Sequence, residues 1–278
     1  MTRRPALLLA LLVALPAAAQ QSLWNVPAGT GTARGGFFFQ EQLNLTRSGE
    51  SNLTTAIGVG KGLELGLNIF HVHLYGDRVP ETARNKVMVN AVYTFDVTDF
   101  MKVQLGGHGG LGRDEHLHRE VPAGFAYLLT RFHFEELRLA TVVGAYAASE
   151  SYLGKGWPAG PMLGVEYELV PEWLVVQADL LLGNHEAAVG VIGAALLLPG
   201  GWQVAVGLQV PSPFSHNNFG CVVELTHVPP GAGDVPEDLN WQEHRVHPKW
   251  IREHRERHGE REPEEAHQQP PEETPGNP

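Results

Sequence analysis

Histidine pairs at short spacing are the side chains in this chain that could bind a metal ion. His71 and His73 lie two apart in a segment with strand-like alternation, so they share a face, and His254 and His258 lie four apart in a polar region where a helix would align them. A zinc site needs three or four ligands. No further ligand accompanies either pair, so we expect packing or solvent exposure at both, and we predict no metal and no cofactor.

A second group combines histidine with acidic residues. His116 and His118 lie with Asp114, Glu115 and Glu120 in a loop-like stretch. Oxygen and imidazole ligands at this density could bind a divalent ion weakly. Solvated loop charge is the reading we favour, because charged loops are common on protein surfaces.

Serine and histidine together could supply a nucleophile and its base. The candidates are Ser149 and Ser151 with either His185 or His216. No motif connects them, and a catalytic triad depends on geometry that spacing does not give. The glycine-rich run 106–112 is not followed by a helix pattern, which a phosphate-binding loop needs. We therefore predict that the protein is not an enzyme.

The clearest chemical pattern is a set of charged and amide side chains confined to one parity of alternating segments. In the run Met101-Lys102-Val103-Gln104-Leu105, polar and apolar residues alternate strictly. A charged side chain facing lipid near the bilayer midplane costs about 2–4 kcal/mol, so this parity predicts an aqueous interior. The main lumen-facing candidates are Glu64, Lys86, Lys102, Gln104, Arg131, Arg138, Glu166, Glu168, Asp179 and Glu224.

These side chains require strands to position them. About twelve segments of roughly ten residues, each with period-two alternation and a turn at its end, fill the chain between Phe37 and Thr226. Tight connections such as 60–62 alternate with longer ones such as 76–85, as periplasmic turns and extracellular loops do. We predict an all-β fold: an antiparallel transmembrane β-barrel of about 12 strands.

The ends of the chain differ from this central region. Residues 1–19 combine two arginines, an apolar run and small residues before Gln20, which predicts a cleaved signal peptide. We assign 20–36 to a periplasmic lead-in, 37–228 to the barrel and 229–278 to a polar, charged and largely disordered periplasmic tail. About ten apolar residues are too few for a helical anchor.

Composition narrows the function classes. The chain has 278 residues, a formal charge of −11 and a single cysteine, Cys221, so an intrachain disulfide is excluded. The acidic balance gives no support to nucleic-acid binding. We expect outer-membrane lipid and the barrel assembly machinery as partners, and a periplasmic partner for the C-terminal tail.

The region from Trp24 to Phe70 carries a family resemblance. Asn25-Val26-Pro27, the run Gly36-Phe37-Phe38-Phe39-Gln40-Glu41-Gln42 and the glycine-spaced segments up to Asn68 resemble the opening of bacterial outer-membrane barrels. The resemblance is to the transporter-like proteins of the phenol-degradation-pathway (MetA-pathway) type. It implies a porin-like role or uptake of hydrophobic compounds.

These observations predict a location in the outer membrane and a channel or transporter-like function for small molecules, hydrophobic compounds among them. A barrel of this strand number is narrow, so opposing lumen charges would pair and leave a small pore or none. A non-conducting barrel that anchors a periplasmic partner through its tail is the alternative, ahead of an outer-membrane enzyme.

Overall fold

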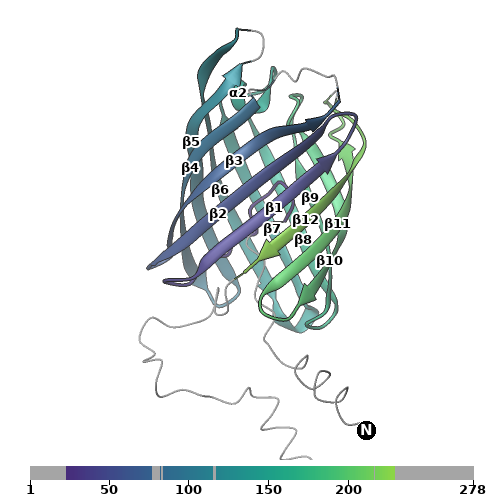
Figure 1. The fold of residues 1–278 in the computed structure, drawn as a ribbon. Helices are drawn as coiled ribbons and strands as arrows, with labels where there is room; N and C mark the ends of the chain where they lie inside the picture. Colours follow the sequence, from purple (N-terminus) through teal and green to yellow (C-terminus); the bar gives the residue numbers. More distant parts are fainter. Residues whose placement is uncertain (1–22, 77–81, 83, 115–116, 216, 229–278) are drawn as a thin grey trace, which may run out of the picture. The chain divides into compact units, whose positions relative to one another are not determined.

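The computed structural model describes residues 23–76, 82, 84–114, 117–215 and 217–228. The predicted signal peptide and the predicted tail 229–278 lie outside these residues. Twelve antiparallel strands close into one barrel in which each strand pairs with its sequence neighbours and β1 pairs with β12 (Figure 1). This confirms the predicted fold class. The strands are β1 (Phe37–Leu45), β2 (Gly49–Gly60), β3 (Leu63–Tyr75), β4 (Arg84–Thr98), β5 (Met101–Asp114), β6 (Arg119–Phe134), β7 (Leu139–Ala148), β8 (Ala159–Val170), β9 (Leu174–Leu181), β10 (Val189–Leu198), β11 (Trp202–Pro211) and β12 (Gly220–His227).

The barrel wall follows from the alternation in the sequence. Along β11, exposed and buried residues alternate without a break from Trp202 to Val210. The outward parity is apolar, with Val89 exposed by 67% and Leu208 by 64%. An outer surface of this kind is stable against lipid rather than water.

Glu41 interrupts the apolar outer face of β1. It lies midway along β1 opposite Leu53 of β2, and its carboxylate accepts a hydrogen bond from the hydroxyl of Ser51. This contact partly satisfies a carboxylate that would otherwise face lipid alone.

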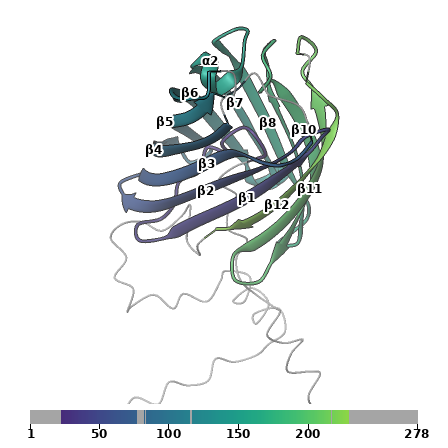
Figure 2. The same ribbon diagram turned by 45° about the horizontal axis from the view of Figure 1, so that its top comes forward.

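Connections at the lower end of the barrel in Figure 1, where β1 begins and β12 ends, are tight. The β2–β3 turn places Lys61 and Gly62 at positive φ (53° and 74°), and the β6–β7 connection is the 3-10 helix η1 (Glu135–Leu137). At the upper end, β5 runs to Asp114 and β6 starts at Arg119, so both strands extend into the stretch around Asp114 and Glu120 that the sequence analysis described as loop-like. The upper β7–β8 connection contains the helix α2 (Glu150–Leu153), visible above the strands in Figure 2.

Aromatic side chains gather at the lower end of the outer surface. Phe37, Trp173 and Trp202 are each more than 40% exposed at the ends of their strands, as in an interfacial girdle. At the upper end, Trp157 and Phe214 lie 6.0 Å apart between ring centroids. Within the described residues, no helix is long and apolar enough to cross a membrane.

One strand departs from regular alternation. The pairing of β3 with β2 shifts between Ser51 and Leu53, and His71 takes a positive φ of 57°. A bulge of this kind turns consecutive residues to the same side. Both Phe70 and His71 therefore line the lumen.

Candidate functional site

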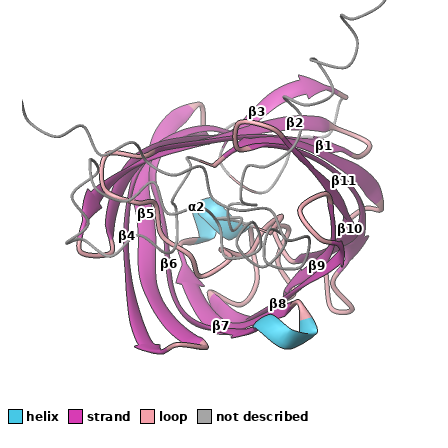
Figure 3. Cartoon of the chain, turned by 90° about the horizontal axis from the view of Figure 1, so that it is seen from below, coloured by secondary structure: helices cyan, strands magenta, loops and turns pink. Residues whose placement is uncertain are grey.

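The N-terminal segment runs inside the barrel. We call residues 23–32 the plug and residues 33–36, which join it to β1, the stalk. Leu23, Trp24, Val26 and Ala28 are each no more than 3% exposed. Viewed along the axis, coil lies within the ring of strands (Figure 3). Residues 23–32 of the predicted lead-in 20–36 therefore lie inside the barrel, where their apolar side chains and backbone polar groups find partners on the inner wall.

Asp179 of β9 binds the start of the plug. Its Oδ2 accepts backbone N–H bonds from Trp24 at 3.0 Å and from Val26 at 2.8 Å, and a third from Asn25. The side-chain amide of Asn25 approaches Oδ1 at 3.4 Å. Three consecutive N–H groups around one carboxylate form an anion-binding nest, which offsets part of the cost of burying Asp179.

Three more wall side chains bind the rest of the plug. Arg131 of β6 donates to the carbonyl of Ala28 at 2.7 Å, and Gln104 of β5 donates to the carbonyl of Thr30 at 3.0 Å. Glu64 of β3 accepts a hydrogen bond from the hydroxyl of Thr32. Because these groups belong to β3, β5 and β6 while Asp179 belongs to β9, the plug crosses the lumen from one side to the other.

Apolar contacts fix the plug in the same position. The Trp24 side chain packs with inward residues of β10 and β11, where a Cβ on Gly193 or Gly207 would lie 2.9 Å or 3.0 Å from Cζ2 of its indole. On the opposite side, Leu23 and Val26 join the buried cluster of β6, β7 and β8. The small residues of the wall thus create the space that Trp24 occupies.

The stalk lies against the lower end of β2. Gly35 donates to the carbonyl of Gly58 at 2.8 Å, and Arg34 forms a parallel bridge with Gly58. A Cβ at position 58 would lie 2.1 Å from the carbonyl oxygen of Ala33, so only glycine allows this approach. The plug is consequently reached from the lower end of the barrel.

A cavity of about 270 Å³ lies above the plug. Trp24, Asn25 and Thr30 of the plug line it, and it extends to Ser48 and Asn217 in the upper connections. Tyr152 of α2 also lines it, because α2 folds inward and packs this ring against His108 and Phe125. The cavity also reaches Phe38, Ala56 and Glu64 toward the lower ends of β1, β2 and β3, so it continues beside the plug along this part of the wall.

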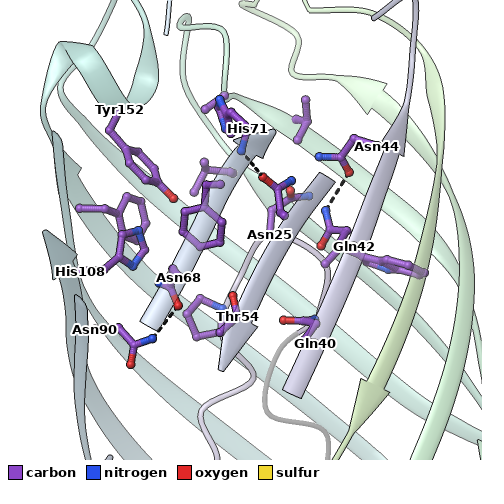
Figure 4. Close-up of a pocket in the computed structure, with 18 of the residues that line it drawn as sticks. Asn25, Gln40, Gln42, Asn44, Thr54, Asn68, His71, Asn90, His108 and Tyr152 are labelled. Carbon is purple, nitrogen blue, oxygen red and sulfur yellow. Dashed lines mark hydrogen bonds between the residues drawn. The ribbon is translucent and has the colours of Figure 1, made fainter. Parts of the chain in front are cut away.

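The cavity wall has two chemically different sides. Carboxamides and hydroxyls project from β1, β2, β3 and β4, as Figure 4 shows for Gln42, Thr54, Asn68 and Asn90. Aromatic rings from β3, β5, β6 and α2 form the other side. There, His108 stacks on Phe125 with 5.1 Å between ring centroids and an interplanar angle of 12°.

Most of the predicted lumen residues lie on the inner wall. Glu166 forms an ion pair with Arg131 at 2.6 Å, and Glu224 accepts a hydrogen bond from the hydroxyl of Thr226. Lys102 lies near the lower end of β5 and pairs with Asp96 at 3.4 Å. The buried members of the set are Glu64, Lys86, Gln104, Arg131, Glu166, Asp179 and Glu224, and Glu168 is half-buried at the lower end of β8.

Arg138 does not line the lumen. It lies directly after η1, outside β7, in an exposed position with a φ of 52°. The sequence prediction placed Arg138 in the lumen by alternation, and its parity does match that of the inward residues Ala140 and Val142. The 3-10 turn ends that alternation before the strand begins.

His71 and Lys86 form a polar cluster at the upper side of the cavity. Lys86 is fully buried, its Nζ lies 3.0 Å from Nδ1 of His71, and it lies 5.3 Å from the ring centre of Tyr152. Thr82 lies 3.1 Å from the same His71 nitrogen. Within the described residues, no group of three or more His, Cys, Asp or Glu side chains could hold a metal ion.

The serines and the histidine considered for catalysis bond to other groups. Ser149 and Ser151 lie 2.9 Å apart at Oγ, and each also contacts backbone of β6. Nε2 of His185 lies 2.6 Å from the hydroxyl of Tyr146, and burial lowers the pKa of His185 to about 4. His116, His216, His254 and His258 lie outside the described residues.

Comparison with solved structures agrees with the architecture. The chain is similar to a structure described as the KdgM porin in complex with disordered oligogalacturonate, with a TM-score of 0.50, 12% identity, and coverage of 68% of this chain and 98% of that chain. At this identity the likeness shows the fold alone. A structure of Acinetobacter baumannii OccAB2 matches with a TM-score of 0.35, 12% identity, and coverage of 67% and 58%, which is too distant to carry an argument.

Comparison by sequence does not place the chain in a family. No protein-family model matches it, and no curated protein sequence does either. The resemblance to the phenol-degradation-pathway type therefore stays a prediction.

The plug is the part of the candidate site that the sequence prediction missed. One signal for it was present: Leu23, Trp24 and Val26 are large apolar residues in a segment assigned to water. Such residues are most often buried in folded proteins. The alternation of the strands carries no information about which segment fills the lumen.

Proposed function

We propose that this protein is an outer-membrane channel for small polar solutes, closed by its own N-terminal plug. The observation that carries the proposal is the lumen itself, which contains a polar cavity toward the loops and the plug below it. The apolar outer wall supports a membrane location, and the predicted signal peptide supports export to the outer membrane.

The way the plug is attached supports a gate rather than a fixed filling. The plug is not a strand of the barrel, and its polar anchors are wall side chains such as Asp179, Arg131 and Gln104. Withdrawal of residues 23–32 toward the lower end would therefore leave all twelve strand pairings in place. A removable segment is what a channel that opens on a signal requires.

A permanently sealed barrel with an anchoring role is the second candidate, because the filled lumen also suits a protein that never conducts. The two functions differ in what happens when the plug is weakened. When the plug is weakened, a gated channel passes solutes. A sealed barrel does not, because side chains of its wall still block the lumen.

We expect Asp179→Ala to increase the passage of small solutes into proteoliposomes. The substitution leaves three plug N–H groups without their acceptor, at a cost of roughly 2–3 kcal/mol, which raises the open fraction roughly 30- to 150-fold. Asp179→Asn keeps one acceptor oxygen and should give a smaller increase. Liposome swelling in an uncharged solute measures both.

The matched control is Leu180→Ala, the outward neighbour on the same strand, which should behave as the unmodified protein. Equal swelling rates for Asp179→Ala and the control, together with unchanged folding on gels, would oppose the gated channel and favour the sealed barrel.

A further inference from the structure

We propose that the cavity above the plug binds a single neutral polyhydroxylated molecule of the size of a monosaccharide. The inference rests on the proposed function, since it takes the cavity as part of the solute path, and it names the class of solute. The volume of about 270 Å³ lies just below the range of about 300–1,000 Å³ for drug-sized ligands. One sugar ring suits this space.

The amide side of the cavity offers both hydrogen-bond donors and acceptors. Gln42 donates to Asn44 at 2.8 Å, and Asn90 donates to Asn68 at 2.6 Å. A carboxamide has two N–H groups and an oxygen with two lone pairs, so each pair keeps both donors and acceptors beyond these bonds. Hydroxyl groups, which donate and accept at once, are the complementary ligand groups.

The opposite side offers flat apolar surface. Rings of Phe125, His108 and Tyr152 lie within 5.2 Å of one another between centroids, and all three line the cavity. A sugar ring carries C–H groups on its face and hydroxyls at its edge. It can therefore lie on these rings while its hydroxyls reach the carboxamides.

The charges at the cavity select against an anionic solute. Glu50, Glu64 and Glu186 line it, whereas Lys86 is the cation at its upper side, 3.0 Å from Nδ1 of His71. The three carboxylates outnumber this ammonium, so a solute with a carboxylate would face a net negative charge. A hydrophobic solute would leave the carboxamides without polar contacts, which disfavours the hydrophobic compounds suggested by the family resemblance.

Binding to the unmodified protein in detergent tests the inference without opening the plug. Saturation-transfer NMR with glucose, glucuronate and phenol as separate probes should show glucose bound, and glucuronate bound at least about tenfold more weakly because of like charge. Phenol should give no saturable signal from this cavity. Tighter binding of glucuronate or phenol than of glucose would overturn the inference.

Two variants locate the site. Gln42→Met and Asn68→Leu keep approximate side-chain volume while removing hydrogen-bonding groups, and each should weaken glucose binding roughly 2- to 12-fold. The control Val89→Leu, on the lipid-facing parity beside Asn90, should leave binding unchanged. Gln42→Met is the more decisive variant, because Gln42 bonds to Asn44 of its own strand whereas Asn68 bonds to Asn90 of the neighbouring strand. If Gln42→Met binds glucose as the unmodified protein does, glucose is bound elsewhere and the inference fails.

The outcomes separate this inference from the channel proposal. Glucose binding with no solute passage in any plug variant would keep the binding site and reject the channel. Solute passage without glucose binding would keep the channel and reject the assigned solute class.

Discussion

Deletion of residues 23–32 is expected to convert a closed barrel into one that conducts in planar bilayers. These residues fill the lumen between β9 on one side and β3, β5 and β6 on the other, so their removal leaves a continuous path below the cavity. Full-length protein should give no steady conductance, and the deletion variant should give discrete single-channel steps.

The opened lumen should prefer cations. Among the buried side chains of the described residues, Glu64, Glu166, Asp179 and Glu224 are acidic, whereas Lys86 and Arg131 are basic. A ring or path of acidic side chains favours cation passage. Reversal potentials in a salt gradient measure this preference. Equal conductance of full-length and deleted protein would show that the plug does not close the channel.

Trp24→Ala should produce the largest effect of a single substitution. The indole fills the space over Gly193 and Gly207 and belongs to a buried cluster with Val191, Ala195 and other small residues. Truncating a buried tryptophan to alanine costs about 3–5 kcal/mol, which raises the withdrawn fraction of the plug roughly 150- to 5,000-fold. Open time in single-channel recordings measures the change.

Trp202→Ala is the matched control for this substitution. Trp202 belongs to β11, the strand whose inner face Trp24 contacts. It is 41% exposed on the outer face, where it contacts Phe39 and His227 rather than the plug. It should leave the open time unchanged. If Trp24→Ala and Trp202→Ala open the channel to the same extent, loss of tryptophan loosens the wall in general and the role of Trp24 as an anchor is wrong.

The barrel could be predicted from the sequence because its physical cause is local. Each strand must place apolar residues toward lipid and polar residues toward the lumen, so Lys102, Gln104 and their neighbours reveal the strand by alternation alone. The same rule wrongly placed Arg138 in the lumen. This residue follows a 3-10 turn outside the strand, although its parity matches that of the strand. It also missed the bulge at His71, since a single extra residue leaves no compositional signal.

The site was less predictable because it depends on contacts between distant segments. Asp179 was assigned to the lumen correctly by its position on the inner wall, but its partners are the backbone N–H groups of residues 24–26, more than 150 positions away. Any residue can supply a backbone N–H group, so the nest leaves no motif. Only the apolar character of Leu23, Trp24 and Val26 indicated that this segment is buried.

A disulfide between the plug and the wall tests most directly whether the N-terminal segment lies inside the barrel in the membrane. A Cβ at Gly31 would lie 3.5 Å from the Cβ of Thr94, within the range of about 3.5–4.5 Å for disulfides. We predict that Gly31→Cys with Thr94→Cys, in a Cys221→Ser background, forms this bond in intact cells, as read by mass spectrometry of unreduced digests. Gly31→Cys with Tyr93→Cys, which points outward, should not. Free thiols in the first pair, or equal cross-linking in both, would contradict a plug inside the lumen.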